Sequence, residues 1–376
     1  MRLEPFLVIA VYLLAIHFVS NIDNINDSVM WNCKLLSNGK GKQEIPREEG
    51  NYATMSVYRH EIPFSRGSKE KAVPNDAVIS SPFFNVSKQS IYNYNPDGEK
   101  LLVVFAVTVD SKNDTVTVAV SNTLYMLAQY AERYKTHTVV FTSTESIVSY
   151  ATSLGHTVVT ETAVNIYNLP FIRNILEVTR LLFDSYYVGY VNSDILFGSN
   201  LFYLVERALQ ARPRLSDINE IAMTVRDVNI TESITRLSLS EFDRFLRTRY
   251  DIGVPRHQDS ADIFLFSKST PFDSLNGIVV GRILVDNCLM RVMYLEGGEL
   301  VSANKYLIGV HQGFDGFKDH IKAVKAKYSD ISWNQKVTGF KYLNHQGTLR
   351  LCNRIVVNTK DVDFIPQRPP HITKKK

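Results

Sequence analysis

The sequence predicts an α/β fold in which a mainly parallel sheet is flanked by helices. Short apolar runs that suit buried strands alternate with runs of roughly ten to fifteen residues that suit helices, as is typical of βαβ units. An aspartate also follows one of the most apolar runs, where a parallel strand would end. Because ligands bind at the carboxyl ends of strands in open α/β sheets, these observations predict a binding site at one edge of the sheet.

The regular alternation begins at Leu101. Expected strands span residues 101–109, 138–142, 157–160, 187–191, 220–226, 261–267 and 306–311. Expected helices span residues 123–134, 145–154, 169–183, 201–210, 239–249 and 286–294. Ser121 and Asn122 are expected to cap the first helix, and Pro170 is expected in the first turn of the third. Residues 348–357 form one more strand-like piece.

The N-terminus predicts entry into the secretory pathway. An apolar run from Phe6 to Val19 has the length of the core of a signal peptide and is short for a membrane span of roughly 20 residues. No clean cleavage site follows it, so we expect residues 1–20 to be a signal-anchor rather than a removed signal peptide. Residues 21–100 are polar and punctuated by glycine, which predicts a stem. We expect residues 101–325 to form the globular domain and residues 326–376 to be a C-terminal extension. Four glycosylation sequons agree with this route: Asn26, Asn85, Asn113 and Asn229.

Composition and missing motifs exclude several functions. The net charge of +4 over 376 residues includes no basic stripe interleaved with aromatic residues, so no nucleic-acid partner is expected. The chain has no GxGxxG, GxxxxGK[ST] or GxSxG motif, which disfavours dinucleotide binding, P-loop nucleotide binding and α/β-hydrolase chemistry. The three cysteines (Cys33, Cys288 and Cys352) lack the spacing of a zinc site. They permit one disulfide and one free thiol, and their spacing does not select the pair.

The segment from Tyr187 to Phe197 carries the predicted site. A buried strand ends on Asn192, Ser193 and Asp194, and the spacing of the first and third puts two oxygen-bearing side chains on one side of the strand end. A sheet without a glycine-rich phosphate loop needs another way to neutralise phosphates, and a divalent cation does this. We therefore interpret Asp194 as a metal ligand. On this segment alone it could equally begin a turn or cap the next helix.

Four segments, in the expected order between Leu101 and Asp315, resemble the GT-A-fold glycosyltransferases of the nucleotide-diphospho-sugar transferase superfamily. Residues 165–174 resemble the helix start that faces the donor, and residues 190–196 are similar to the DxD motif in a variant with Asn first. Residues 262–266 with 280–287 resemble the acceptor-side region, and residues 310–312 with Asp315 resemble the C-terminal histidine region of the metal shell. The resemblance implies a GT-A-like, Rossmann-type sheet.

The resemblance also implies a role for each residue of the site. Mn²⁺ or Mg²⁺ would be held by Asp194 and His311, the catalytic base would be Asp286, and the donor would contact Asn192, Ser193, Arg173 and Asn174. The sequence departs from the family pattern in two respects. Asn192 replaces the first acid of a strict DxD, and the acceptor-side segment lacks the tryptophans that related sequences place around the aspartate.

Several structural alternatives stay open at this point. A lone histidine such as His311 is commonly a satisfied residue at a strand end, and Asp286 also suits the N-cap of an apolar helix. Arg173 and Asn174 could lie on a solvated helix face. Asp262 is expected to be the first residue of its strand rather than an acid that supports the site.

The expected protein is a secretory-pathway glycosyltransferase, anchored in the Golgi or ER membrane with a lumenal catalytic domain, or else secreted. Its partners would be a nucleotide-sugar donor, a glycan or glycoprotein acceptor, and the membrane through the N-terminal segment. The alternative is a catalytically inactive lumenal protein that binds carbohydrate with the same fold, which the missing first acid at Asn192 would favour.

Overall fold

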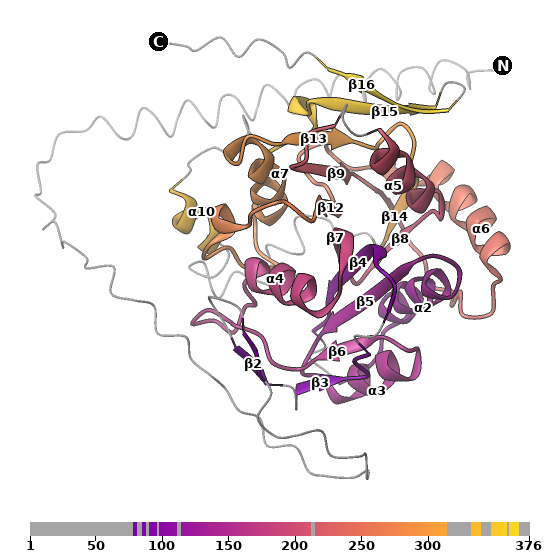
Figure 1. Ribbon diagram of the computed structural model, residues 1–376. Helices are drawn as coiled ribbons and strands as arrows, with labels where there is room; N and C mark the ends of the chain where they lie inside the picture. The colour runs from indigo at the N-terminus through magenta and orange to yellow at the C-terminus, as the bar shows by residue number, and fades with distance from the viewer. Residues whose placement is uncertain are drawn as a thin grey trace, which may run out of the picture. The chain divides into compact units, whose positions relative to one another are not determined.

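The computed structural model describes residues 78–80, 85–87, 90–95, 98–110, 114–211, 215–313, 332–339, 347–358 and 361–367. This part of the chain has a mixed α/β fold with a large central sheet and helices on both of its faces (Figure 1). The predicted signal-anchor, most of the predicted stem, Cys33 and Asp315 lie outside the described residues. Within the described ranges, no helix has the length and apolar character to cross a membrane.

The described strands form one large sheet, one smaller sheet and one isolated pair. Across the ten-stranded sheet they follow the order β16 (Val362–Pro366), β15 (Arg354–Asn358), β13 (Glu299–Ser302), β9 (Asn219–Met223), β12 (Ile263–Ser267), β7 (Ser185–Asn192), β4 (Leu101–Thr108), β5 (Thr136–Phe141), β6 (Thr157–Val159) and β3 (Ile91–Tyr92). The four-stranded sheet has the order β11 (Val254–Pro255), β10 (Arg226–Val228), β14 (Gly309–Gln312) and β8 (Ile195–Phe197). The isolated pair is β1 (Val78–Ser80) with β2 (Asn85–Ser87).

Helices cover the two faces of the large sheet. The α-helices are α2 (Val118–Arg133), α3 (Glu145–Ser153), α4 (Ile172–Leu182), α5 (Asn200–Gln210), α6 (Leu239–Ile252), α7 (Val285–Leu295) and α10 (Trp333–Thr338), and the short 3₁₀ turns are η3 (Asp273–Leu275) and η4 (Leu349–Leu351). One apolar core contains residues of α2, α3, α5 and α6 together with the smaller sheet, and the other contains residues of α4 and α7. Because side chains alternate along a strand, Val103, Phe105 and Val107 of β4 join the first core, while Val104 and Ala106 join the second.

The large sheet is mixed, and strand direction decides what meets at its edge. β4 and β7 are parallel, with Thr108 beside Asn192. β12 runs antiparallel between β7 and β9, with Ile263 opposite Val191. The start of β12 therefore lies beside the end of β7, which brings Asp262, the residue before β12, to the edge where the site was predicted.

Two helix starts differ from their predicted positions. α2 begins at Val118, and the hydroxyl oxygen of Thr117 accepts a hydrogen bond from the Val120 amide at 3.3 Å, so Thr117 is the cap and the predicted caps lie inside the helix. Pro170 lies before α4 rather than in its first turn, because it forms an isolated bridge with Val164 and its carbonyl accepts from the Val280 amide at 2.9 Å. Gly155 follows α3 with φ of 85°, a backbone conformation in which glycine is the least strained residue.

The two cysteines in the described part of the chain are buried free thiols, at Cys288 and Cys352. No disulfide therefore joins these two. The segment predicted as a C-terminal extension contributes β15 and β16 to the large sheet, and β3 joins it from the predicted stem.

Candidate functional site

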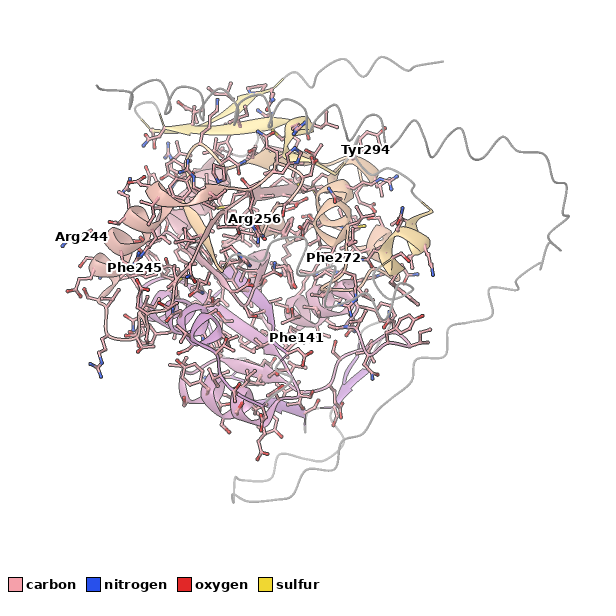
Figure 2. The ribbon with its side chains drawn as sticks, turned by 180° about the vertical axis from the view of Figure 1, so that it is seen from behind. Phe141, Arg244, Phe245, Arg256, Phe272 and Tyr294 are labelled. Atoms are coloured by element: carbon pink, nitrogen blue, oxygen red, sulfur yellow. The ribbon has the colours of Figure 1, made fainter. Side chains whose placement is uncertain are left out.

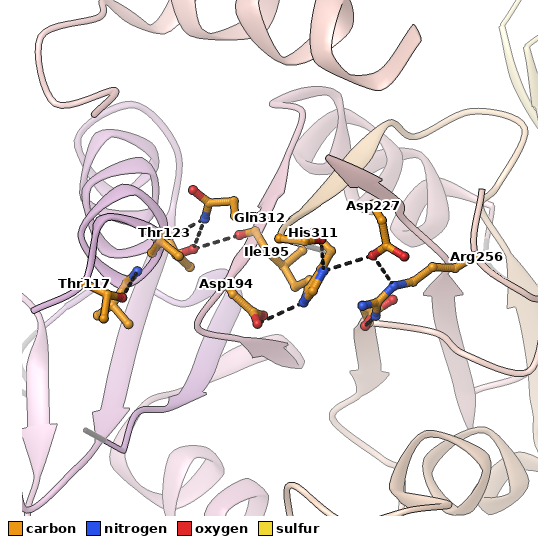
Figure 3. A network of polar contacts seen from close by, with 12 residues as sticks. Thr117, Thr123, Asp194, Ile195, Asp227, Arg256, His311 and Gln312 are labelled. Carbon is orange, nitrogen blue, oxygen red and sulfur yellow. Dashed lines mark hydrogen bonds and ion pairs between the residues drawn. The ribbon is translucent and has the colours of Figure 1, made fainter. Parts of the chain in front are cut away.

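The two predicted metal ligands lie next to each other although they are 117 residues apart in sequence (Figure 3). Asp194 occupies the tight turn between β7 and β8, and His311 lies on β14, which pairs antiparallel with β8 so that His311 is opposite Ile195. The Nε2 atom of His311 is 3.0 Å from Oδ2 of Asp194. The backbone amide of Gln312 also donates to the Asp194 carbonyl at 2.9 Å, which holds the turn against β14.

The other ring nitrogen of His311 faces a second carboxylate. Nδ1 lies 3.0 Å from Oδ1 of Asp227 and 3.2 Å from the carbonyl oxygen of Gly313. Asp227 reaches this position because β10 pairs parallel with β14 and Asp227 is directly beside His311 in that register. Both neighbours are acceptors, so Nδ1 carries a proton.

Asp227 was not predicted as a site residue. The sequence predicts one strand over residues 220–226, whereas the chain forms β9, breaks, and continues as β10 in the smaller sheet. The only signal was an acidic residue shortly after a largely apolar run, similar to the signal at Asp194.

The approach of His311 Nε2 to Asp194 requires a cation between them. A neutral imidazole has one N–H, and Nδ1 already uses it, so Nε2 and the carboxylate would otherwise present two lone pairs to each other. A proton on Nε2 or a metal ion satisfies both atoms. Burial lowers the pKa of His311, but the hydrogen bond and charge of Asp194 outweigh burial, so the pKa is raised above its ordinary value.

Arg256 links the histidine cluster to a further buried acid. Its Nε donates to Oδ1 of Asp227 and its Nη1 to Oδ1 of Asp262, each at 2.7 Å. The Asp262 side chain is 2% exposed, and its Oδ2 is buried without a hydrogen-bond partner among the described residues. Burial raises the pKa of Asp262 to about 6, against the opposing charge of Arg256. Asp262 is therefore part of the site and not merely the start of a strand.

Asn192, Ser193 and Asp286 lie around this cluster. Asn192 ends β7 and Ser193 follows it in the turn, both half-buried. Asp286 is the second residue of α7 rather than its N-cap, which is Leu284 with φ of 74°. A small part of Asp286 is exposed, yet protein surrounds it densely: this burial raises its pKa well above the ordinary value, and the charge of Asp262 raises it further.

Arg173 and Asn174 lie at the start of α4 and are both buried, so neither is on a solvated helix face. Arg173 Nη2 pairs with Asp273 Oδ1 at 2.5 Å. Asn174 Oδ1 accepts from the Thr162 hydroxyl at 3.0 Å and from the Ala163 amide at 3.2 Å. Both side chains thus hold α4 to neighbouring segments, and contact of either with a donor stays a prediction.

The cluster offers two adjacent ligands for a divalent cation. In the described ranges, no group of three or more His, Cys, Asp or Glu side chains is arranged to hold a metal ion. Mg²⁺ is commonly held by one or two protein carboxylates, with substrate phosphates and water as its other ligands. Asp194 fits that mode as the carboxylate, since its Oδ1 is buried without a hydrogen-bond partner among the described residues, and His311 Nε2 is the adjacent second donor. Asp227 on Nδ1 matches the carboxylate that commonly orients a metal-binding histidine.

The fold and the site together define a mixed α/β protein with an acid–histidine cluster at one end of its central strands. Two solved structures resemble the chain at a TM-score of 0.38. They are mannosyl-3-phosphoglycerate synthase from Rubrobacter xylanophilus, at 16% identity over 72% of this chain and 88% of that chain, and a mycobacterial protein, at 10% identity over 72% and 85%. Similarity at this level does not establish a shared function. Comparison with protein-family models gives no match, and comparison with curated proteins also gives none.

Proposed function

We propose that this protein is a metal-dependent glycosyltransferase that moves a sugar from a nucleotide-diphosphate donor to a glycan or protein acceptor. The observation that carries the proposal is the pair formed by Asp194 and His311, whose Oδ2 and Nε2 atoms are 3.0 Å apart, close enough for both to bind one metal ion. Carboxylate oxygen and imidazole nitrogen together suit Mn²⁺ or Mg²⁺, with Mn²⁺ the better match for the imidazole.

The residues around the pair have complementary roles in this proposal. Asp194 and His311 hold the cation, which when bound supplies Lewis-acid neutralisation of the charge on the leaving diphosphate. Asn192 at the end of β7 and Ser193 in the turn after it contact the donor, as do Arg173 and Asn174 at the start of α4. Asn192 is neutral, so Asp194 supplies the formal negative charge of this segment.

Asp286 is the general base in the proposed reaction. It accepts the proton of the acceptor hydroxyl while that oxygen forms a bond to the anomeric carbon and the bond from this carbon to the diphosphate oxygen breaks. The raised pKa of Asp286, caused first by burial and then by the charge of Asp262, makes its ionised form a stronger proton acceptor than an exposed aspartate. Direct displacement of this kind inverts the configuration at the anomeric carbon.

The proposal includes a location in the secretory pathway. Residues 1–20 would anchor the protein in the Golgi or ER membrane with the catalytic domain in the lumen, or would direct it to secretion. Asn229, the acceptor residue of one sequon, is exposed, as glycosylation there would require.

A thermal-shift screen of UDP- and GDP-sugars with and without Mn²⁺ tests the proposed function. We expect one class of donor to raise the melting temperature of the wild-type protein only when Mn²⁺ is present, because a ligand that binds the folded state stabilises it. Asp194→Ala should abolish this shift. Asp251→Ala, which changes an exposed aspartate on α6, is the matched control and should keep it.

Donor binding that is unchanged in Asp194→Ala would contradict the site. Metal-dependent binding of a donor without hydrolysis or transfer would instead favour a protein that binds sugar nucleotides without catalysis.

A further inference from the structure

Arg256 lies at the centre of the acid–histidine cluster, and the proposed reaction gives it no role. It follows β11, and its backbone amide donates to the Val225 carbonyl at 3.3 Å, within the break between β9 and β10. Its side chain is 17% exposed. Figure 2 shows Arg256 among the central elements of the molecule, whereas Arg244 projects from α6 at the periphery.

The guanidinium of Arg256 fixes two carboxylates in one arrangement. Nε and Nη1 are rigidly spaced donors, and each contacts Oδ1 of a different aspartate, Asp227 and Asp262, at 2.7 Å. Asp262 is almost fully buried and Asp227 is 22% exposed, so these hydrogen bonds form where water competes little. The guanidinium of Arg256 therefore fixes the position of Asp227 relative to the buried Asp262.

The position of Asp227 in turn decides how the ring of His311 lies. The oxygen of Asp227 that Arg256 holds, Oδ1, is also the atom 3.0 Å from His311 Nδ1 (Figure 3). An acceptor at Nδ1 keeps the proton on that nitrogen and turns the Nε2 lone pair toward Asp194. If Asp227 rotated away, Nδ1 would lose its charged acceptor and keep the Gly313 carbonyl, at 3.2 Å, as a neutral acceptor, which favours the Nδ1 tautomer less strongly.

We propose that Arg256 is a positioning residue, which clamps Asp227 and Asp262 so that Asp227 orients His311 with Nε2 facing Asp194. The orienting role stands on the geometry alone, while its consequence for metal binding rests on the proposed function. Arg256 does not touch the donor in this proposal. It acts through Asp227 and His311.

The test uses the full chain with two substitutions and one matched control. The two substitutions are Asp227→Asn, which keeps the shape of the side chain and removes its charge, and Arg256→Lys. Glu299→Gln is the control, because Arg354 pairs with Glu299 at 3.0 Å and the exposed fractions, 17% and 24%, are close to those of Arg256 and Asp227, 17% and 22%. Thermal unfolding establishes which variants fold.

The first readout is the dissociation constant for Mn²⁺, measured by electron paramagnetic resonance. Loss of a carboxylate that orients a metal-binding histidine typically weakens metal affinity roughly 10–100-fold, and we expect Asp227→Asn and Arg256→Lys to fall in that range. Glu299→Gln should bind Mn²⁺ as the wild type does. Unchanged Mn²⁺ affinity in a folded Asp227→Asn protein would overturn the proposed consequence for metal binding.

The second readout is the tautomer of His311 in the metal-free protein, from long-range ¹H–¹⁵N NMR at alkaline pH, where the ring is neutral. The wild type and the control should show the proton on Nδ1, and the two site variants should shift toward protonation on Nε2. An unchanged tautomer in Asp227→Asn, or in a folded Arg256→Lys protein, would overturn the positioning role. If the wild type does not bind Mn²⁺, the proposed function fails, and the tautomer still decides the role of Arg256. If Arg256→Lys does not fold, Asp227→Asn decides alone.

Discussion

Asp286 is the residue whose proposed role depends most on its surroundings. It lies in the first turn of α7, and both burial and the neighbouring Asp262 favour its protonated form. Asp286→Asn removes the proton acceptor with little change of shape. We expect transfer to fall by roughly 100-fold or more, because general base catalysis typically contributes at least this factor. Donor binding should stay unchanged, since Asp286 is assigned to the acceptor side.

Measuring the donor dissociation constant and the transfer rate on the same preparations checks this expectation. Asp251→Asn, at an exposed position of α6, is the control. A parallel loss of donor binding in Asp286→Asn would show that the residue holds the donor or the fold rather than the acceptor proton.

The pH dependence of transfer follows from the raised pKa of Asp286. A general base must be ionised, and burial together with the charge of Asp262 moves ionisation of Asp286 to higher pH than for an exposed aspartate. We therefore expect kcat/KM to rise with pH over a range well above the ordinary aspartate pKa. A profile that is flat there, or that falls as pH rises, would contradict the assignment of Asp286 as the base.

At the scale of single elements, β7 is the strand that carries Asn192 and leads to Asp194, and its packing depends on a glycine. A Cβ added at Gly189 would lie 2.6 Å from Cδ1 of Phe105 and 3.0 Å from Cδ2 of Leu265. We expect Gly189→Ala to destabilise the protein by about 1–3 kcal/mol, because neighbouring core side chains must shift. Urea unfolding measures the change.

Gly98→Ala is the control for this substitution, because a Cβ there meets nothing within 4 Å. If Gly189→Ala and Gly98→Ala proved equally stable, the close packing of β7 against β4 and β12 would be wrong. A stable Gly189→Ala protein that had lost Mn²⁺-dependent donor binding would show instead that the strand shifts at its carboxyl end.

The sequence predicted elements well where local pattern decides them. β4, β7, β12 and α6 agree with their predicted ranges to within a few residues, since long apolar runs and helical periodicity persist whatever their partners are. The start of α2 was predicted wrongly because its first turn is β-branched and resembles a strand. The split of residues 219–228 into β9 and β10 depends on pairing with β12 and β14, which no local pattern reveals.

At the scale of the whole molecule, the difference between local pattern and long-range pairing also explains which site residues could be predicted. Sequence reasoning named Asp194 from its place at a strand end and His311 and Asp286 from the family resemblance, and the fold brings Asp194 and His311 into contact. It missed Asp227 and Arg256, because their importance comes from the pairing of β10 with β14 and from a hydrogen bond across the smaller sheet. Residues that act on another side chain rather than on a substrate leave no motif at a fixed spacing.

Buried ionisable groups distributed through the molecule set its stability against pH. His156 is 2% exposed, and its Nε2 lies 2.9 Å from the Leu124 carbonyl, to which it donates. Burial lowers the pKa of His156 to about 4 from an ordinary value of 6.5. Since the folded-state pKa is depressed, the folded state favours the neutral ring. This stability is complete above pH 6.5 and is lost as pH falls from 6.5 toward 4.

We predict that His156 alone makes the free energy of unfolding fall by up to about 3 kcal/mol over this interval. His156→Gln can still donate to the Leu124 carbonyl but does not titrate, so its unfolding free energy should fall less than that of the wild type. Urea unfolding at a series of pH values measures both slopes. His257→Gln, at an exposed histidine, is the control for the exchange of histidine for glutamine.

Two other buried groups, Glu220 and His137, also change the stability of the folded state with pH. Burial raises the pKa of Glu220 well above its ordinary value, so Glu220 favours the folded state at acidic pH, opposite in sign to His156. His137, whose pKa burial also lowers to about 4, adds to the loss at acidic pH. The charge of His137 also contributes to the lowered pKa of His156, so the difference between the two slopes reports His156 together with its interaction with His137. Equal slopes would mean that His156 is accessible to protons in the folded state, and its place between α2 and α3 would then be wrong.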